Sequence, residues 1–433
     1  MVRRITFTLL LVFIVKIIHP QRLERDSYPT TEILFQNNLS WKDIKTKAEC
    51  ERKFIFIDVY ASWCTPCREM DKLVYINDEI GEFFNSHFIS VKVQIDTTKD
   101  DDYNIRSWYP DAKVLMEKYK ISGVPSYLFF SPEGEIVHRE TGAKSVKELL
   151  QIANDALCIN RQYYYFLSNY RNGIKYYPLL PYVARIARSI SEKAFSDSLA
   201  RDYIENYLNQ KNEDSWINRD DLEFLGSFVN VLKSSDNVFH FFLQHNWKID
   251  SIVGDKQYSN RILKYVITKE EITPRLKLLA TSDKNWKKLE RIIEKKYGKQ
   301  LAESSILESK LKWYSDKKDW PNIIKFNIEK VDKYGIENTS LGRAVLNNMI
   351  YEVIFKHSSE KKSLNWAIQR MKIILKADST DGINMDTYAN LLYKSGKINL
   401  GLRWEKRAVQ LDPLNEDLQT NLKKMQNRAP TWN

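Results

Sequence analysis

The sequence predicts an α/β domain followed by an all-α domain. Apolar runs of strand length alternate with helical segments between residues 40 and 158, and strand signals disappear after residue 158. Only nine of the 13 glycines serve the remaining 275 residues, which is typical of helices joined by short turns. With 433 residues, 43% of them apolar, we expect two or three globular domains rather than a disordered chain.

The first domain should have the element order βαβαββα. Ser40 and Asp43 form a capping box that begins a helix ending near Glu51. Two nearly continuous apolar runs are typical of buried strands, and a Pro-Glu-Gly turn predicts a hairpin. The predicted strands are residues 54–60, 88–95, 125–130 and 135–139, and the helices between and after them are residues 68–84, 114–119 and 145–156. This order predicts an α/β sandwich.

The excess of positive charge lies before residue 21 and after residue 158. The net charge of +11 divides into +3 for residues 1–20, −5 for residues 21–158 and +13 for the remainder. Lys and Glu are interleaved in the last part, which is typical of the solvated faces of helices. No basic stripe or aromatic RNA-binding motif accompanies them, so we expect no nucleic-acid partner. An acidic protein partner for the helical domain stays open.

Residues 1–20 have the pattern of an export signal. Arg3 and Arg4 precede an uncharged run from Ile5 to Val15, which is shorter than the roughly 20 residues of a membrane-spanning helix. The residues after the run lack a small-x-small cleavage pattern, so a retained anchor and a structural apolar segment remain alternatives to a cleaved signal peptide. We expect an exported protein, periplasmic or otherwise extracytoplasmic, with membrane contact only through such an anchor.

The four cysteines point to redox chemistry. Cys64 and Cys67 form a CxxC motif, whereas Cys50 and Cys158 stand alone. A zinc site would need a second close pair of ligands, and a c-type haem would need a histidine in place of Arg68. We therefore expect no metal and no cofactor, but a dithiol of the kind that persists as a disulfide outside the cytosol. For Cys50 and Cys158 we expect buried free thiols rather than a bridge.

The two cysteines of the motif should differ in role. At the start of a helix, the partial positive charge of the helix N-terminus lowers the pKa of Cys64 and makes it the attacking thiolate. Pro66 fits the first helical turn because it has no N–H to lose there. We therefore expect Cys64 to be the exposed nucleophile and Cys67 the inward-facing resolving thiol.

These residues resemble the thioredoxin family. Residues 58–67 (DVYASWCTPC) are similar to its active-site strand and helix start, and residues 122–125 (SGVP) are similar to the loop with its cis-proline. The resemblance covers about residues 40–158 and implies a thioredoxin fold. Residues 91–96 look most like exported thioredoxin-like proteins related to the periplasmic domain of thiol:disulfide interchange proteins. Residues 97–112 are longer and more polar than the family's usual connection.

The resemblance implies roles for five further residues. Asp58 matches the buried acid that exchanges protons with the resolving thiol, and burial would raise its pKa toward neutrality. Lys92 matches the lysine beside this acid, the alternative being a surface lysine whose stem packs on the sheet. Pro125 matches the cis-proline that faces the dithiol. The backbone at Val124 would pair with an extended substrate, and Trp63 would cover the sulfurs.

The residues between the cysteines bear on the direction of electron flow. Thr65-Pro66 differs from the Gly-Pro of reducing thioredoxins and lacks the histidine of strongly oxidising relatives. Such a histidine stabilises the thiolate and makes the disulfide more oxidising, so its absence favours reduction or isomerisation. An exported oxidase remains an alternative.

A repeat near the C-terminus resembles the tetratricopeptide family. Its small and bulky positions are matched by Tyr388, Ala389, Leu392, Tyr393, Gly396, Gly401, Ala408, Asp412 and Pro413. A shift of 34 residues gives Ala367, Ile374 and Asp378, which predicts repeats near residues 341–415. The pattern fails at Glu405, where a bulky aromatic is usual. The alternative is an ordinary helical hairpin.

The sequence therefore predicts three parts: a signal or anchor (residues 1–20), a thioredoxin-like domain (residues 21–158) and a helical domain (residues 159–433). The predicted function is exported thiol:disulfide oxidoreductase, acting on protein thiols and disulfides together with an unidentified redox partner. The alternative is a helical-repeat scaffold or chaperone whose thioredoxin-like domain is not catalytic.

Overall fold

The computed structural model describes residues 31–211, 218–276 and 283–432. The expected signal or anchor, residues 1–20, lies outside these residues. The chain forms two compact units, one reaching Tyr203 and the other beginning at Ile204. Among the helices that the structure describes, none is both long and apolar enough to cross a membrane.

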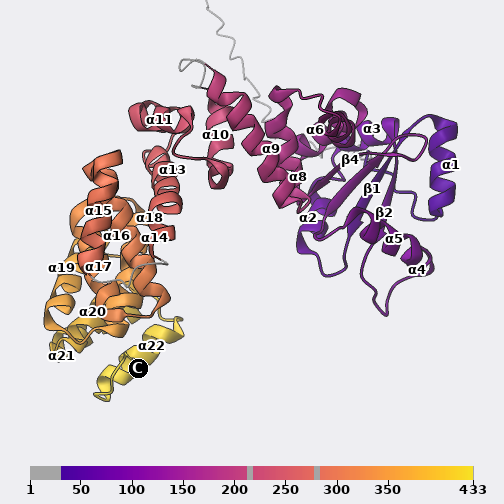
Figure 1. Cartoon of the computed structure of the whole chain (residues 1–433). Helices are drawn as coiled ribbons and strands as arrows, with labels where there is room; N and C mark the ends of the chain where they lie inside the picture. The colour runs from indigo at the N-terminus through magenta and orange to yellow at the C-terminus, as the bar shows by residue number, and fades with distance from the viewer. Residues whose placement is uncertain (1–30, 212–217, 277–282, 433) are drawn as a thin grey trace, which may run out of the picture. The chain divides into compact units, whose positions relative to one another are not determined.

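The first unit contains a four-stranded sheet in the order β2-β1-β3-β4, flanked by helices (Figure 1). β1 runs parallel to β2 and antiparallel to β3, and β3 is antiparallel to β4. The elements are α1 (Trp41–Glu51), β1 (Phe54–Tyr60), α2 (Thr65–Leu73), α3 (Asp78–His87), β2 (Phe88–Gln94), α4 (Tyr103–Ser107), α5 (Tyr109–Tyr119), β3 (Ser126–Phe130), β4 (Ile136–Thr141) and α6 (Val146–Leu157). The predicted α/β sandwich with the thioredoxin fold is confirmed.

The local predictions hold at the first helix and fail at the second. Ser40 caps α1 with the predicted capping box. The single helix expected over residues 68–84 is instead two helices, α2 and α3, and α2 begins at Thr65 directly after Cys64. The break occurs because the Asn77 side chain accepts from the backbone N–H groups of Glu79 and Ile80 and so starts a new helix. The helix expected over residues 114–119 begins earlier, at Tyr109.

Each face of the sheet carries its own apolar core. On one face α1 and α5 cover the strands; the buried residues there include Ile44, Ala48, Ile55, Ile57, Val59, Ala112, Leu115, Leu128 and Phe130. On the other face α2, α3 and α6 cover them; the buried residues include Phe56, Met70, Ile80, Phe84, Tyr127, Phe129, Leu149 and Ala153. The helix that begins at the dithiol therefore lies on the second face.

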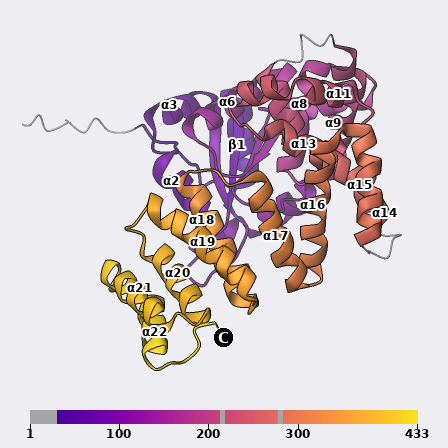
Figure 2. The ribbon, with the colours of Figure 1, turned by 90° about the vertical axis from the view of Figure 1, so that its left-hand side faces the viewer.

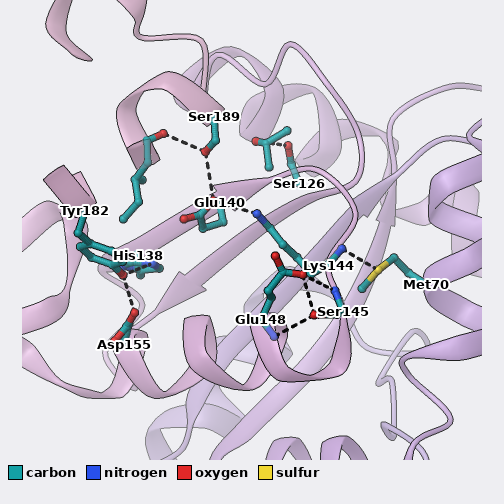
Figure 3. A network of polar contacts seen from close by, with 12 residues as sticks. Met70, Ser126, His138, Glu140, Lys144, Ser145, Glu148, Asp155, Tyr182 and Ser189 are labelled. Atoms are coloured by element: carbon teal, nitrogen blue, oxygen red, sulfur yellow. Dashed lines mark hydrogen bonds and ion pairs between the residues drawn. The ribbon is translucent and has the colours of Figure 1, made fainter. Parts of the chain in front are cut away.

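Three helices after residue 158 also belong to the first unit: α7 (Tyr163–Arg171), α8 (Leu180–Ser189) and most of α9 (Lys193–Asn206). The backbone N–H of Tyr163 donates to Nδ1 of the fully buried His138 on β4, at 3.1 Å. The Tyr182 hydroxyl donates to Asp155 on α6, at 2.7 Å, and the Tyr182 ring stacks on the His138 ring (Figure 3). Burial lowers the pKa of His138 to about 4, so this contact is made by a neutral imidazole at pH 7.

Residue 158 therefore marks the end of α6, while the division between the two compact units falls after Tyr203. The contacts of His138 and Asp155 explain this extension, because they join α7 and α8 to β4 and α6.

The second unit is built from helices. The helices are α10 (Arg219–Ser227), α11 (Asn237–Gln244), α12 (Asn246–Val253), α13 (Tyr258–Ile267), α14 (Thr273–Leu276), α15 (Asp283–Tyr297), α16 (Lys299–Asp316), α17 (Trp320–Tyr334), α18 (Ser340–Met349), α19 (Lys361–Ala377), α20 (Gly382–Lys394), α21 (Ile398–Leu411) and α22 (Glu416–Gln426). Helices α19 to α22 pack against one another in succession (Figure 2).

The closest packing in this unit is between α20 and α21. Gly401 on α21 permits it, because a Cβ there would lie 2.9 Å from the backbone oxygen of Ala389 and 3.0 Å from Tyr393. This pair of helices occupies the positions of the predicted repeat. That this repeat is of the tetratricopeptide type stays a prediction.

Candidate active site

The two cysteines of the CxxC motif lie at the start of α2 and form a disulfide. Their Cα atoms are 5.3 Å apart. Cys64 is the N-cap of the helix, and its sulfur accepts from the backbone N–H of Cys67 at 3.1 Å. Because this N–H is one of the unpaired donors of the helix N-terminus, it favours negative charge on the Cys64 sulfur when the disulfide is reduced.

Both cysteines are buried in this oxidised state. Cys64 is 1% exposed and Cys67 is 3% exposed, so the expectation of an exposed Cys64 is wrong for the disulfide form. The two residues pack with Ala61 and against Tyr60, Ile95 and Val124, side chains that the motif alone does not reveal. Trp63, in contrast, keeps 67% of its surface exposed next to the dithiol.

The loop before β3 approaches the dithiol through Val124. The Val124–Pro125 peptide bond is cis, as the family resemblance implies. The oxygen of Pro125 accepts from Gly142 N–H at 2.8 Å, and the Ser126 hydroxyl donates to the oxygen of Gly123 at 2.7 Å. These bonds hold the loop, and Val124 packs against the cluster formed by Ala61 and the two cysteines.

Asp58 is a buried acid in the middle of β1. It is 1% exposed, and its carboxylate Oδ2 lies 3.8 Å from the Lys92 ammonium on β2. Burial raises the pKa of Asp58 to about 7, against the opposing effect of Lys92. The Asp71 carboxylate raises this pKa further, and the Tyr75 hydroxyl lowers it. A carboxyl group with such a pKa can both accept and donate a proton near neutrality.

Lys92 connects Asp58 to the helix of the dithiol. Its ammonium pairs with Asp71, which lies one helical turn after Cys67 on α2, and it lies over the Tyr60 ring, 4.7 Å from the centroid. Lys92 is thus a half-buried ion-pair partner rather than a surface lysine. Asp71 was not predicted from the sequence, although its spacing of four from Cys67 places both on one face of a helix.

A second set of polar contacts supports the turn before Cys64. Ser62 donates its backbone N–H at 2.9 Å to Asp96, which follows β2. Arg68 reaches back from α2 to the oxygen of Ser62, at 2.8 Å, and to the hydroxyl of Thr65, at 2.9 Å. Asp96, directly before the polar connection of residues 97–112, therefore helps to hold the active-site turn.

Cys50 and Cys158 are free and exposed. The expectation of buried thiols is wrong for both, because each lies at the end of a surface helix, Cys50 in the last turn of α1 and Cys158 at the C-cap of α6.

Comparison with known proteins places the similarity in the first unit. Residues 41–157 match the family model described as a thioredoxin-like domain. The chain is 33% identical over 113 residues to a thioredoxin H-type protein of Fagopyrum esculentum, which covers 26% of this chain and 81% of that protein.

A second relative is the thiol:disulfide interchange protein DsbD of Haemophilus influenzae (strain 86-028NP), with 26% identity over 120 residues, 27% of this chain and 19% of that protein. The chain therefore spans about a fifth of the length of that relative. A solved structure titled DsbH oxidoreductase aligns over 32% of this chain and 94% of its own, with 19% identity and a TM-score of 0.27.

Proposed function

The chain belongs to the thioredoxin family through residues 41–157, and we propose that it is an exported thiol:disulfide oxidoreductase that acts on protein substrates as a reductase or isomerase. The observation that carries the proposal is the Cys64–Cys67 disulfide at the start of α2, beside the cis bond before Pro125. A buried acid with a pKa of about 7 on the adjacent strand supports it.

The reaction would proceed in two exchanges. The Cys64 thiolate attacks one sulfur of a substrate disulfide, forms a mixed disulfide and releases the other substrate sulfur as a thiolate. Asp58 then takes the proton of the Cys67 thiol, directly or through a water molecule. The Cys67 thiolate attacks the sulfur of Cys64, and the second substrate thiolate leaves and is protonated. The substrate disulfide is reduced to two thiols, the dithiol is oxidised, and a thiol-bearing redox partner must reduce it again.

Substrate would be bound by the exposed groups around the dithiol. The Trp63 ring offers exposed apolar area, and the backbone at Val124 would pair with an extended segment of the substrate, next to Pro125. The second unit would select or hold the substrate protein. Since residues 204–433, which form this unit, carry a net charge of +9, such a partner would be acidic, and its capture should weaken as salt rises.

Two cysteine variants test the assignment. With Cys67→Ala, the mixed disulfide has no resolving thiol, so disulfide-linked adducts with exported proteins should accumulate; with Cys64→Ala none should form. Cys50→Ala, which removes an exposed thiol outside the motif, is the matched control and should leave exchange unchanged. Equal adducts from Cys64→Ala and Cys67→Ala would remove the assigned roles, and absence of exchange by the wild-type protein would favour the non-catalytic scaffold. Equilibration with glutathione distinguishes a reductase from an oxidase by the potential it gives.

A further inference from the structure

A row of polar side chains crosses the sheet through Asp58. Asp58 on β1 lies opposite Lys92 on β2 and opposite Tyr127 on β3, and Tyr127 lies opposite Glu140 on β4. Residues directly opposite on neighbouring strands point to the same face of a sheet. All four therefore lie on the face that α2, α3 and α6 cover, with Glu140 accepting from Lys144 and Ser189 at the far end (Figure 3). Within the sheet, Asp58 has an ammonium group on one side and a phenol on the other.

Tyr75 brings a second phenol to Asp58. It follows α2, where its backbone N–H donates to Met70, and its side chain is 3% exposed in the core that contains Tyr127. The Lys92 ammonium lies 3.8 Å from Oδ2 of Asp58 and 5.7 Å from the centre of the Tyr75 ring, so the Tyr75 side chain lies beside the Asp58 carboxyl group. Burial raises the pKa of Tyr75 well above its usual value, so the hydroxyl keeps its proton and is a donor toward a charged carboxylate.

Three buried oxygens meet here without other partners. Among the described residues, Oδ1 of Asp58 and the hydroxyls of Tyr75 and Tyr127 have no hydrogen bond of normal geometry. A buried polar atom without a partner destabilises the fold, so such atoms are uncommon. Lys92 approaches the other carboxylate oxygen, Oδ2. Lys92 and Tyr75 are the neighbours that favour the charged carboxylate, so with Lys92 at Oδ2 the candidate donor for Oδ1 is the Tyr75 hydroxyl.

We propose that Tyr75 is a positioning residue for Asp58: its hydroxyl donates to Oδ1 of the charged carboxylate and so keeps Asp58 ready to accept the proton of Cys67 near neutral pH. This inference rests on the proposed function. Two groups that face Asp58 come from the neighbouring strands, Lys92 from β2 and Tyr127 from β3. Asp71 on α2 and Tyr75 after α2 face it from the helix side, and Tyr60 lies two residues away on β1. Lys92 and Tyr75 favour the charged carboxylate, whereas Asp71 opposes it.

The test is the pH dependence of the resolving step. The mixed disulfide between Cys64 and glutathione is prepared, and release of glutathione in a single turnover is followed from pH 5 to 9.5. Tyr75→Phe keeps the packed ring and removes the donor, so the midpoint of the rate profile should move upward by about one pH unit. The rate should then fall about tenfold below pH 7 and equal the wild-type rate above pH 9.

Two further variants act as comparison and control. Tyr127→Phe removes the hydroxyl next to Tyr75 and should give a smaller upward shift. Tyr119→Phe removes a hydroxyl from the core on the opposite face of the sheet and should keep the wild-type profile. An unchanged midpoint in Tyr75→Phe, with or without uniform slowing, would overturn the proposal, and a downward shift would show that Tyr75 accepts a proton from Asp58 instead of donating.

A carbon-13 NMR titration of the Asp58 carboxyl group separates this inference from the proposed function. The carboxyl titration should move upward in Tyr75→Phe whether or not the variant is active, and an unchanged titration would overturn the inference. If the wild-type protein does not resolve the mixed disulfide, the proposed function fails, while the titration still decides the role of Tyr75.

Discussion

Asp58 in the first unit and Glu405 in the second are both buried acids, and their surroundings differ. Asp58 in the first unit has the Lys92 ammonium 3.8 Å away. Glu405 on α21 in the second unit is 0% exposed, and the ionisable group that acts on it is another acid, Asp386 on α20. Burial together with Asp386 raises the pKa of Glu405 to about 9, compared with about 7 for Asp58.

The difference separates a group suited to proton exchange from a group suited to structure. Asp58 is close to half-charged at pH 7, so it can pass a proton in either direction. Glu405 stays protonated and can donate a hydrogen bond to Asp386, which explains why neither of its oxygens has a donor among the described residues. Asp386 in turn accepts from the side-chain amides of Asn390, at 2.7 Å, and Asn421, at 2.8 Å. One nearby cation therefore distinguishes the two sites.

The largest expected effect is the loss of the proton acceptor itself. Asp58→Asn should keep the fold, because the amide has nearly the same shape, and should slow resolution of the mixed disulfide about 100-fold at pH 7. The single-turnover release of glutathione measures this step. Glu405→Gln, which changes the other buried acid, is the control and should resolve at the wild-type rate. If Asp58→Asn also resolves at the wild-type rate across the pH range, Asp58 has only a structural role.

Removing the cation should make Asp58 resemble Glu405. Lys92→Met keeps the length of the side chain and removes the charge, so the pKa of Asp58 should rise above 7, the more so because Asp71 loses its partner. We expect resolution at pH 7 to slow about tenfold and the midpoint of its pH profile to move upward. Lys72→Met, which removes an exposed lysine next to Asp71 on α2, should change neither. A profile that stays in place would show that Lys92 does not control the protonation of Asp58.

The two sites should also differ in how stability depends on pH. Each acid binds its proton more tightly in the folded state, so its contribution is largest below the unfolded pKa and is lost as pH rises to the folded pKa. For Asp58 this window runs from 3.8 to about 7, and for Glu405 from 4.5 to about 9. Between pH 7 and 9 the contribution of Asp58 fades, and Glu405 supplies the larger of the two slopes, at most about 1.4 kcal/mol per pH unit.

Glu405→Gln tests that slope. The amide can donate to Asp386 as the protonated acid does, so stability near pH 7 should change little and most of the loss between pH 7 and 9 should disappear. Urea denaturation followed by circular dichroism, at several pH values, measures it. Glu329→Gln, an exposed acid on α17, should keep the wild-type slope. A wild-type slope in Glu405→Gln would mean that Glu405 is charged in the folded protein.

The sequence was sufficient where chemistry depends on neighbours along the chain. The Ser40 capping box, the strands and the dithiol at a helix start all follow from local spacing. It was insufficient where partners come from other elements. The break between α2 and α3 was missed because apolar residues continue through Tyr75 and Ile76, although Asn77 followed by two acidic residues is a pattern typical of a helix start.

The same limit applies to the buried polar groups. Tyr75 and Tyr127 have the sequence pattern of ordinary core residues, and only the register of β1 and β3 brings them to Asp58. Glu405 was recognised as a departure from the repeat pattern, but its meaning depends on Asp386 and Asn421, which lie on the helices before and after it. Burial of Cys64 likewise depends on Val124, 60 residues away.

The smallest expected effect concerns the amides that stabilise the charge on Asp386. Asn421 on α22 is 8% exposed and donates to Asp386 Oδ1. Burial raises the pKa of Asp386 and the two amides lower it, so Asn421→Ala removes one donor that favours its charged form, while Asn390 still supplies another. We therefore expect a loss of about 1 kcal/mol at pH 7, measured by the same urea denaturation. Asn427→Ala, at the exposed end of α22, is the control. Equal stability of the two variants would mean that Asp386 carries no charge at pH 7. Glu405 and Asp386 would then both be protonated, and the contrast with Asp58 would lie in this neutral pair.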